Sequence, residues 1–171
     1  FDKNKLILCF KLLPERYKVV IVGTGEQQEM VMSWLNKPML KNRAFYAGLL
    51  SKDKLLATYK LFDVFVLPSI TTSISVEQFG AVLAEAMACG VPVIGSSSGG
   101  IPETIGNAGL IFTEGNPQSL ADAIIKLSKD EILREKLITD GLTKYINNYS
   151  CDAYADSIAS LFGLVQPSFS G

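Results

Sequence analysis

Residues 75–95 read SVEQFGAVLAEAMACGVPVIG, and this stretch decides the fold of the chain. Small and apolar residues with strong helix propensity dominate its middle part, so the pattern predicts a buried helix over residues 80–89. A glycine begins this helix, and Glu77 and Glu85 lie before it and within it. The apolar run at residues 91–95 follows at once. A helix that leads directly into a buried strand is typical of a β–α–β unit in a parallel sheet.

Other short apolar runs, rich in β-branched and aromatic residues, recur along the chain, and each predicts a strand buried on both faces. Together with the run at residues 91–95, they give predicted strands at residues 18–23, 43–48, 64–68, 91–95 and 109–112. Helical spacing separates them at residues 5–13, 26–35, 52–62 and 80–89, with a short turn at 102–105. Strands that alternate with helices predict an α/β fold: a Rossmann-like parallel sheet with helices on both faces.

Only helical spacing remains after residue 112. Asn116 and Pro117 offer an N-cap and a first-turn proline for a helix at residues 118–128. Two further helices are expected at residues 131–149 and 152–162. These helices are expected to pack as a C-terminal flank of the sheet.

The length of 171 residues favours one domain with a core of its own. We expect residues 1–165 to form this domain and residues 166–171, which read QPSFSG, to be a tail or linker. The chain begins with Phe1, Asp2 and Lys3, which is neither a secretory signal nor a natural start. We therefore expect the chain to be a fragment of a longer protein.

Hydrophobic residues make up 48% of the chain and charged residues 19%, with a net charge of -1 and interspersed signs. This balance gives no basic surface for nucleic acid, and no apolar run approaches the roughly 18 residues of a membrane span. Cys9, Cys89 and Cys151 are far apart and predict free, buried thiols in a reducing, cytoplasmic compartment. The chain has no histidine, which excludes histidine zinc sites and Ser-His-Asp triads built within it.

Ligands of open parallel sheets bind beyond the carboxyl ends of the strands. The loops at that edge are residues 23–25, 48–51, 69–78, 95–100 and 113–115, and four of these five contain glycine. Strand ends often need glycine for a sharp exit, so Gly23 and Gly25 alone are weak signs of a phosphate site.

The loop at residues 69–78 is long and rich in serine and threonine, and Phe79 and Gly80 follow it at the helix start. The first turn of a helix has free N–H groups and a partial positive charge, which suit a diphosphate. Glu77 and Glu85 fit such a site if their carboxylates accept hydrogen bonds from sugar hydroxyls. On spacing alone, a solvated loop acid at position 77 and an ordinary helix acid at position 85 remain open alternatives.

A wider set of residues resembles a known family over nearly the whole chain. The resemblance rests on VGTG at 22–25, DVFVLPS at 63–69, EQFG at 77–80, EAMACGVPVI at 85–94, GGIPE at 99–103, AGLIF at 108–112 and LADAI at 120–124. Their order and spacing resemble the C-terminal half of retaining GT-B glycosyltransferases of the family 4 type, also called glycosyl transferases group 1. That family has two glutamates separated by seven residues where Glu77 and Glu85 lie.

The resemblance implies that the chain is the donor-binding domain of an enzyme that transfers a sugar from a UDP- or GDP-sugar. Glu77 would contact hydroxyls of the donor sugar as the catalytic residue, and Glu85 would hold the ribose. The remaining implied donor contacts are the amides of Phe79, Gly80 and Ala81 at the diphosphate and the backbone of Leu49 and Leu50 at the base. Lys54 is a weaker base contact, and the resemblance assigns no role to residues 71–75.

The chain also departs from the family pattern. The family has an arginine and a Lys-Gly pair that bind the diphosphate just ahead of the position of Phe1, and an N-terminal domain that binds the acceptor. Both are absent from this sequence, so we expect the isolated chain to be inactive and to need the missing domain as its partner. The family scheme requires no metal ion, and the chain lacks the Asp-x-Asp pair of metal-dependent transferases. The acceptor would be a glycan or a lipid-linked saccharide, the second of which implies membrane association of the full-length protein.

Two alternative functions remain open from the sequence. One is a GT-B sugar-nucleotide epimerase or phosphorylase, and the other is a noncatalytic Rossmann-like nucleotide-binding or interaction module. The glutamate pair followed directly by EAMACGVPVI favours the transferase over the epimerase or phosphorylase. A dehydrogenase is disfavoured because no strand is followed by G-x-G-x-x-G at a helix start.

Overall fold

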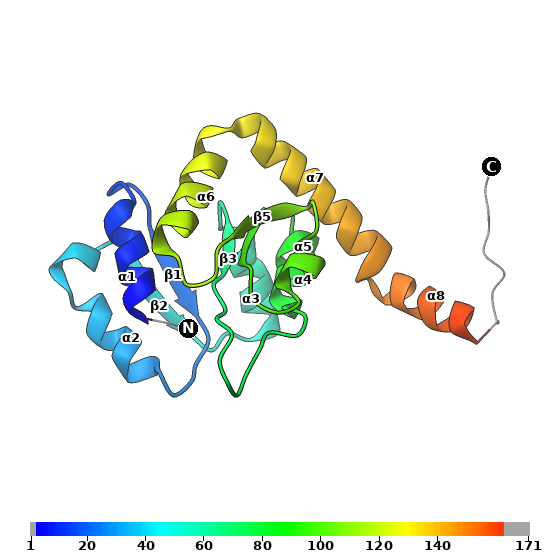
Figure 1. Ribbon diagram of the computed structural model, residues 1–171, viewed down its shortest axis with the longest axis horizontal. Coiled ribbons are helices and arrows are strands. Elements are labelled where there is room, and N and C mark those ends of the chain that lie inside the picture. Colours follow the sequence, from blue (N-terminus) through cyan, green and yellow to red (C-terminus); the bar gives the residue numbers. More distant parts are fainter. Residues whose placement is uncertain (1–2, 163–171) are drawn as a thin grey trace.

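The computed structural model describes residues 3–162 and confirms the predicted alternation of strands and helices. Figure 1 shows the arrangement of the elements. The strands are β1 (Val19–Val22), β2 (Ala44–Gly48), β3 (Phe65–Leu67), β4 (Val93–Ser96) and β5 (Gly109–Phe112). The helices are α1 (Lys3–Leu12), α2 (Gln28–Leu35), α3 (Lys52–Tyr59), α4 (Ala81–Ala88), α5 (Ile101–Ile105), α6 (Pro117–Lys129), α7 (Glu131–Asn148) and α8 (Cys151–Leu161).

All pairings between the described strands are parallel, as predicted, and they form two hydrogen-bonded groups. β1 pairs with β2, while β3, β4 and β5 form a second sheet in that order. Helix α1 packs against both groups: Ile7 and Phe10 contact the core under β1 and β2, and Cys9 contacts the core beside β4. Apolar packing through α1 therefore joins the two sheets.

Helices cover both faces of the β3–β4–β5 sheet, and β4 is buried along its whole length, as predicted. The prediction that every strand is buried on both faces is wrong for β1, β2 and β5, where Val20, Phe45 and Ile111 are exposed. Side chains of α3, α4 and α5 pack on one face around Val93. Its neighbour Ile94 packs on the other face, against residues of α1 and α6. Successive residues of a strand point to opposite faces, so an unbroken apolar run fits a strand that has a core on each side.

Helices α6 and α7 form the predicted C-terminal flank, but α8 has no buried residue, so the prediction that it packs on the sheet is wrong. Asn116 is the N-cap of α6, because its side chain accepts hydrogen bonds from the backbone amides of Gln118 and Ser119. Helix α7 crosses the β5 side of the sheet, and α8 extends away from both sheets at the end of α7 (Figure 1). The predicted tail at residues 166–171 lies outside the described residues. A short 3-10 helix at Pro38–Leu40 was not predicted, since three residues carry no periodic pattern.

Gly95 allows α5 to lie directly on β4. A Cβ atom at this position would be 2.4 Å from Cγ2 of Ile101 and 2.6 Å from Cδ1 of Ile105, both fully buried. Real Cβ atoms essentially never approach so closely, so a side chain at position 95 would displace the Ile101 and Ile105 side chains or α5 itself. The glycine that ends the predicted strand is therefore a packing requirement.

We expect Gly95→Ala to lower the free energy of unfolding by about 1–3 kcal/mol, because it adds a methyl group to a filled core. Gly25→Ala is the matched control: a Cβ there meets nothing within 4 Å, and the change should stay within about 1 kcal/mol. Urea denaturation of the two variants measures the difference. Equal stabilities would contradict the close packing of α5 on β4.

Candidate functional site

The candidate site lies at the carboxyl edge of the β3–β4–β5 sheet, where the loops after the three strands meet. The hydroxyl of Ser96 at the end of β4 donates a 2.7 Å hydrogen bond to the carbonyl of Ser69 after β3. The amide of Ser97 donates to the carbonyl of Phe112 at the end of β5, 2.9 Å away. The loop after β4 is thus fastened to both of its neighbours.

The loop after β4 also lies against the backbone of the loop that contains Glu77. The amide of Gly100 donates to the carbonyl of Glu77 at 2.8 Å. A Cβ at Gly99 would be 2.0 Å from that same oxygen, and a Cβ at Gly100 would be 2.0 Å from the carbonyl oxygen of Gln78. Only two adjacent glycines leave room for this contact, which fixes where Glu77 lies.

A carboxylate from the third loop holds the other end of the loop at residues 69–78. Glu114, after β5, accepts hydrogen bonds from both the amide and the hydroxyl of Thr71, the latter at 3.1 Å. The Thr71 hydroxyl lies 2.9 Å from that of the buried Ser98, and the amide of Glu114 donates to the Ser97 hydroxyl at 2.9 Å. The sequence analysis missed Glu114, because its partner is 43 positions away.

Gly80 is the N-cap of α4, as the predicted helix start requires, and its φ of 74° is in the left-handed region. A Cβ there would be 2.9 Å from Cδ2 of Leu67 and 3.1 Å from Cδ1 of Leu83. We expected this glycine for the close approach of a ligand to the backbone. The structure gives it an additional, structural requirement, since both its conformation and its packing disfavour a side chain.

Glu77 is half-buried and lies at the N-terminus of α4. Its Oε1 accepts a hydrogen bond from the amide of Gly80 at 3.1 Å, and its Oε2 accepts one from the hydroxyl of Ser69 at 3.4 Å. An ionised carboxylate has about four acceptor sites, so two remain for a ligand. Its role as the sugar contact stays a prediction, and in the structure it also caps α4.

Glu85 is exposed on α4, and its hydrogen-bond partner is Tyr59, a buried residue of α3. The Tyr59 hydroxyl donates a 3.0 Å hydrogen bond to Oε2 of Glu85. Burial, and then the charge of Glu85, raise the pKa of Tyr59 above its ordinary value, so the phenol stays protonated and can act as the donor. One oxygen of this exposed carboxylate therefore has a fixed partner, and its role as the ribose contact stays a prediction.

The other predicted donor contacts lie on both sides of these glutamates. Phe79 is 42% exposed, and its ring meets Tyr149 edge to face at 5.2 Å, while Ala81 begins α4 and is exposed. Leu49 and Leu50 lie between β2 and α3; Leu49 is 79% exposed and Leu50 is half-buried. Leu49 and Leu50 thus belong to the β1–β2 group, and α3 connects them to Glu85 through Tyr59.

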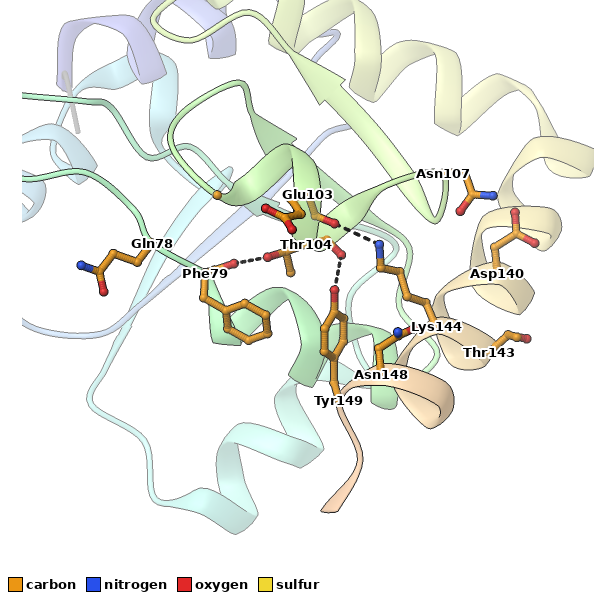
Figure 2. Close-up of a pocket in the computed structure, with 11 residues that line it drawn as sticks. Gln78, Phe79, Glu103, Thr104, Asn107, Asp140, Thr143, Lys144, Asn148 and Tyr149 are labelled. Carbon is orange, nitrogen blue, oxygen red and sulfur yellow. Dashed lines mark hydrogen bonds between the residues drawn. The ribbon is translucent and has the colours of Figure 1, made fainter. Parts of the chain in front are cut away.

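A polar cavity of about 700 Å³ lies beside the candidate site, between α5 and the C-terminal half of α7 (Figure 2). Its lining includes Gln78 and Phe79, the two residues before Gly80, but not Glu77 or Glu85. The hydroxyl of Tyr149 donates to the carbonyl of Thr104 at 2.9 Å, and the Thr104 hydroxyl donates to the carbonyl of Phe79 at 2.5 Å. The cavity wall thereby supports the segment just before Gly80.

The three thiols are free, as predicted, but only Cys9 is buried. Cys89 is half-buried, and Cys151 is exposed at the first position of α8, so the prediction of three buried thiols is wrong. The small and apolar neighbours of Cys151 in the sequence suggested burial, but α8 extends away from both sheets and leaves this residue exposed. Within residues 3–162, no group of three or more Cys, Asp or Glu side chains is placed to hold a metal ion, and no helix is long and apolar enough for a bilayer.

The sequence of residues 3–143 matches the family glycosyl transferases group 1, which is most of the chain. The chain belongs to this family. It is 31% identical over 147 residues to a GDP-mannose-dependent monoacylated α-(1-6)-phosphatidylinositol monomannoside mannosyltransferase of Corynebacterium glutamicum, with 84% of this chain and 38% of that protein covered. The match confirms the family inferred from the glutamate pair and its neighbouring motifs.

Two solved structures share the fold. HepE of Anabaena in complex with UDP has a TM-score of 0.79 at 22% identity, over 96% of this chain and 45% of HepE. The C-terminal domain of a glycosyl transferase group 1 family protein, LpcC of Francisella tularensis, has a TM-score of 0.71 at 21% identity, over 86% of this chain and 80% of that domain. The chain spans between 21% and 40% of the length of these curated relatives.

We expect Glu114→Ala to lower the free energy of unfolding by about 1–2 kcal/mol, because Thr71 loses a charged acceptor. Thr71→Val removes the same hydroxyl hydrogen bond. The loss of unfolding free energy in the double variant should therefore be smaller than the sum of the two single losses, by at least about 0.5 kcal/mol. Urea denaturation of the four proteins gives this coupling. Glu26→Ala, at an exposed loop acid, is the control and should change little. Additive losses would show that Glu114 does not hold the loop through Thr71.

Proposed function

We propose that this chain is the donor-binding half of a retaining glycosyltransferase, which transfers a sugar from a nucleoside diphosphate sugar to a glycan or lipid-linked saccharide. The observation that carries the proposal is a pair of carboxylates at the carboxyl edge of the sheet, one before α4 and one within it. Glu77 lies at the N-terminus of α4 and Glu85 lies within the helix, and each retains acceptor capacity for a hydroxyl.

The start of α4 supplies the anion site of the proposal. The first amides of a helix lack intrahelical partners and carry roughly half a positive charge in total. Because the amide of Gly80 donates to Glu77, the amides of Phe79 and Ala81 are the two predicted contacts that we propose for the diphosphate. Fixed dipoles that face a leaving diphosphate stabilise its charge without reorganisation, and this is the catalytic contribution we assign to α4.

The glutamates lie outside the cavity between α5 and α7, so a donor on them needs a second wall. We infer that another domain of the same enzyme supplies this wall, along with the acceptor site and the cations for the diphosphate. The length of the curated relatives supports this inference, since the chain spans at most 40% of it. The isolated chain is then inactive and binds donor more weakly than the full-length enzyme.

Similar proteins support a nucleotide sugar as the donor and leave its base open. HepE is solved in complex with UDP, and the relative from C. glutamicum is GDP-mannose-dependent. The backbone of Leu49 and Leu50 is the proposed contact of the base, and the transfer requires no metal ion in this proposal. We place the enzyme in the cytoplasm, in polysaccharide biosynthesis, and at a membrane surface where its acceptor is lipid-linked.

In the full-length enzyme, Glu85→Ala should weaken binding of the better ligand of UDP and GDP by about 1.5–3 kcal/mol, because the ribose loses a charged acceptor. Isothermal titration calorimetry measures this loss. The control is Glu29→Ala, which removes an exposed glutamate from the first turn of α2 and should leave the affinity unchanged. Unchanged affinity in Glu85→Ala would refute the ribose contact, and a wild-type enzyme that binds neither nucleotide would favour a noncatalytic module.

A further inference from the structure

Tyr59 places a buried hydroxyl beside the exposed carboxylate of Glu85. The side chain of Tyr59 is 1% exposed, and its ring lies edge to face with Phe65 at a centroid distance of 5.4 Å. Its hydroxyl is 3.0 Å from Oε2 of Glu85 and 3.4 Å from the carbonyl oxygen of Val82. The ring is held by packing on the core, so the hydroxyl is a fixed donor rather than a mobile surface group.

The protonation state of Tyr59 follows from its surroundings. Burial and the neighbouring carboxylate both raise the pKa of Tyr59, which keeps the phenol protonated at neutral pH. Glu85 is therefore the acceptor. One hydrogen bond to Oε2 leaves Oε1 and the remaining lone pairs of the carboxylate available for the hydroxyls of a ligand.

We propose that Tyr59 is a positioning residue, which fixes the Glu85 carboxylate for a ribose hydroxyl of the donor nucleotide. This inference rests on the proposed function of Glu85. An exposed glutamate side chain samples several rotamers, and binding would have to select one of them at a cost in conformational entropy. A donor bond from a buried, immobile phenol selects the rotamer before the ligand arrives.

The position of Tyr59 in the chain adds a second consequence. Tyr59 ends α3, and this helix begins two residues after Leu49 and Leu50, the proposed contact of the base. One short helix thus connects the segment under the base to the carboxylate under the ribose. The Tyr59–Glu85 hydrogen bond therefore sets the distance between two parts of the same nucleoside site.

Ribose discrimination in the full-length enzyme tests this inference. The probes are UDP, 2′-deoxy-UDP and 3′-deoxy-UDP, or the three guanosine counterparts if GDP binds more tightly. Tyr59→Phe keeps the ring and removes the donor. We expect its affinity for the ribonucleotide to fall about three- to tenfold, the range of one hydrogen bond, while its affinity for the deoxynucleotide that lacks the Glu85-bound hydroxyl changes less than twofold.

Two further variants make the outcome specific. Tyr149→Phe removes a similar phenol bond, to the carbonyl of Thr104, and should leave the ratio of ribonucleotide to deoxynucleotide affinity unchanged. Glu85→Ala should abolish that ratio, and Tyr59→Phe should then have no additional effect in the Glu85→Ala background. If Tyr59→Phe loses the fold, 4-fluorophenylalanine at position 59 fills the space of the phenol without a donor.

The two possible failures have different signatures. A folded Tyr59→Phe enzyme with the wild-type ratio, alongside a Glu85→Ala enzyme that has lost it, overturns the positioning role of Tyr59 and leaves the proposed function intact. A Glu85→Ala enzyme with the wild-type ratio overturns the ribose contact itself, and with it the inference about Tyr59. A reduced ratio in both Tyr149→Phe and Tyr59→Phe also overturns the inference, because the effect would then follow from any lost phenol bond.

Discussion

The contact between the backbones of two strand-end loops is the constraint on which the candidate site depends. The amide of Gly100 bonds to the carbonyl of Glu77, and neither Gly99 nor Gly100 has room for a Cβ atom. This contact fixes the loop after β3 at its C-terminal end, while Glu114 holds Thr71 near its N-terminal end. A loop fastened at both ends presents Glu77 and the start of α4 in one geometry.

Close packing also explains two other glycines of the site. Gly80 has a left-handed backbone and a filled space beside it, and Gly95 has α5 directly above it. These glycines are explained by packing, so their presence alone does not indicate a ligand. The polar groups indicate function more directly than the glycines do. Glu85 is exposed, and yet the buried phenol of Tyr59 holds its carboxylate in place. Ordering this side chain costs conformational entropy, and the surface thereby has a hydrogen-bond acceptor in a fixed position.

The cavity beside α7 is not the place that we propose for the donor. Its walls are polar and it supports Phe79 through Thr104, yet Glu77 and Glu85 do not line it. A nucleotide sugar on α4 lies on an open edge of the sheet, which a second domain completes in our proposal. Figure 2 shows Gln78 and Phe79, from the segment before α4, among the side chains that line the cavity.

The sequence by itself determined the five strands, the order of helices, the Asn116 cap and the positions of both glutamates, because hydrophobic period, capping and turn chemistry are local properties. It also determined the family, through motifs in a fixed order. Only the tertiary structure decided the partners of those residues. Tyr59 meets Glu85 across 26 positions and Thr71 meets Glu114 across 43, and Cys151 is exposed although its neighbours in sequence suggested burial. These contacts depend on how α3, α4 and the strand-end loops pack together, which no local pattern encodes.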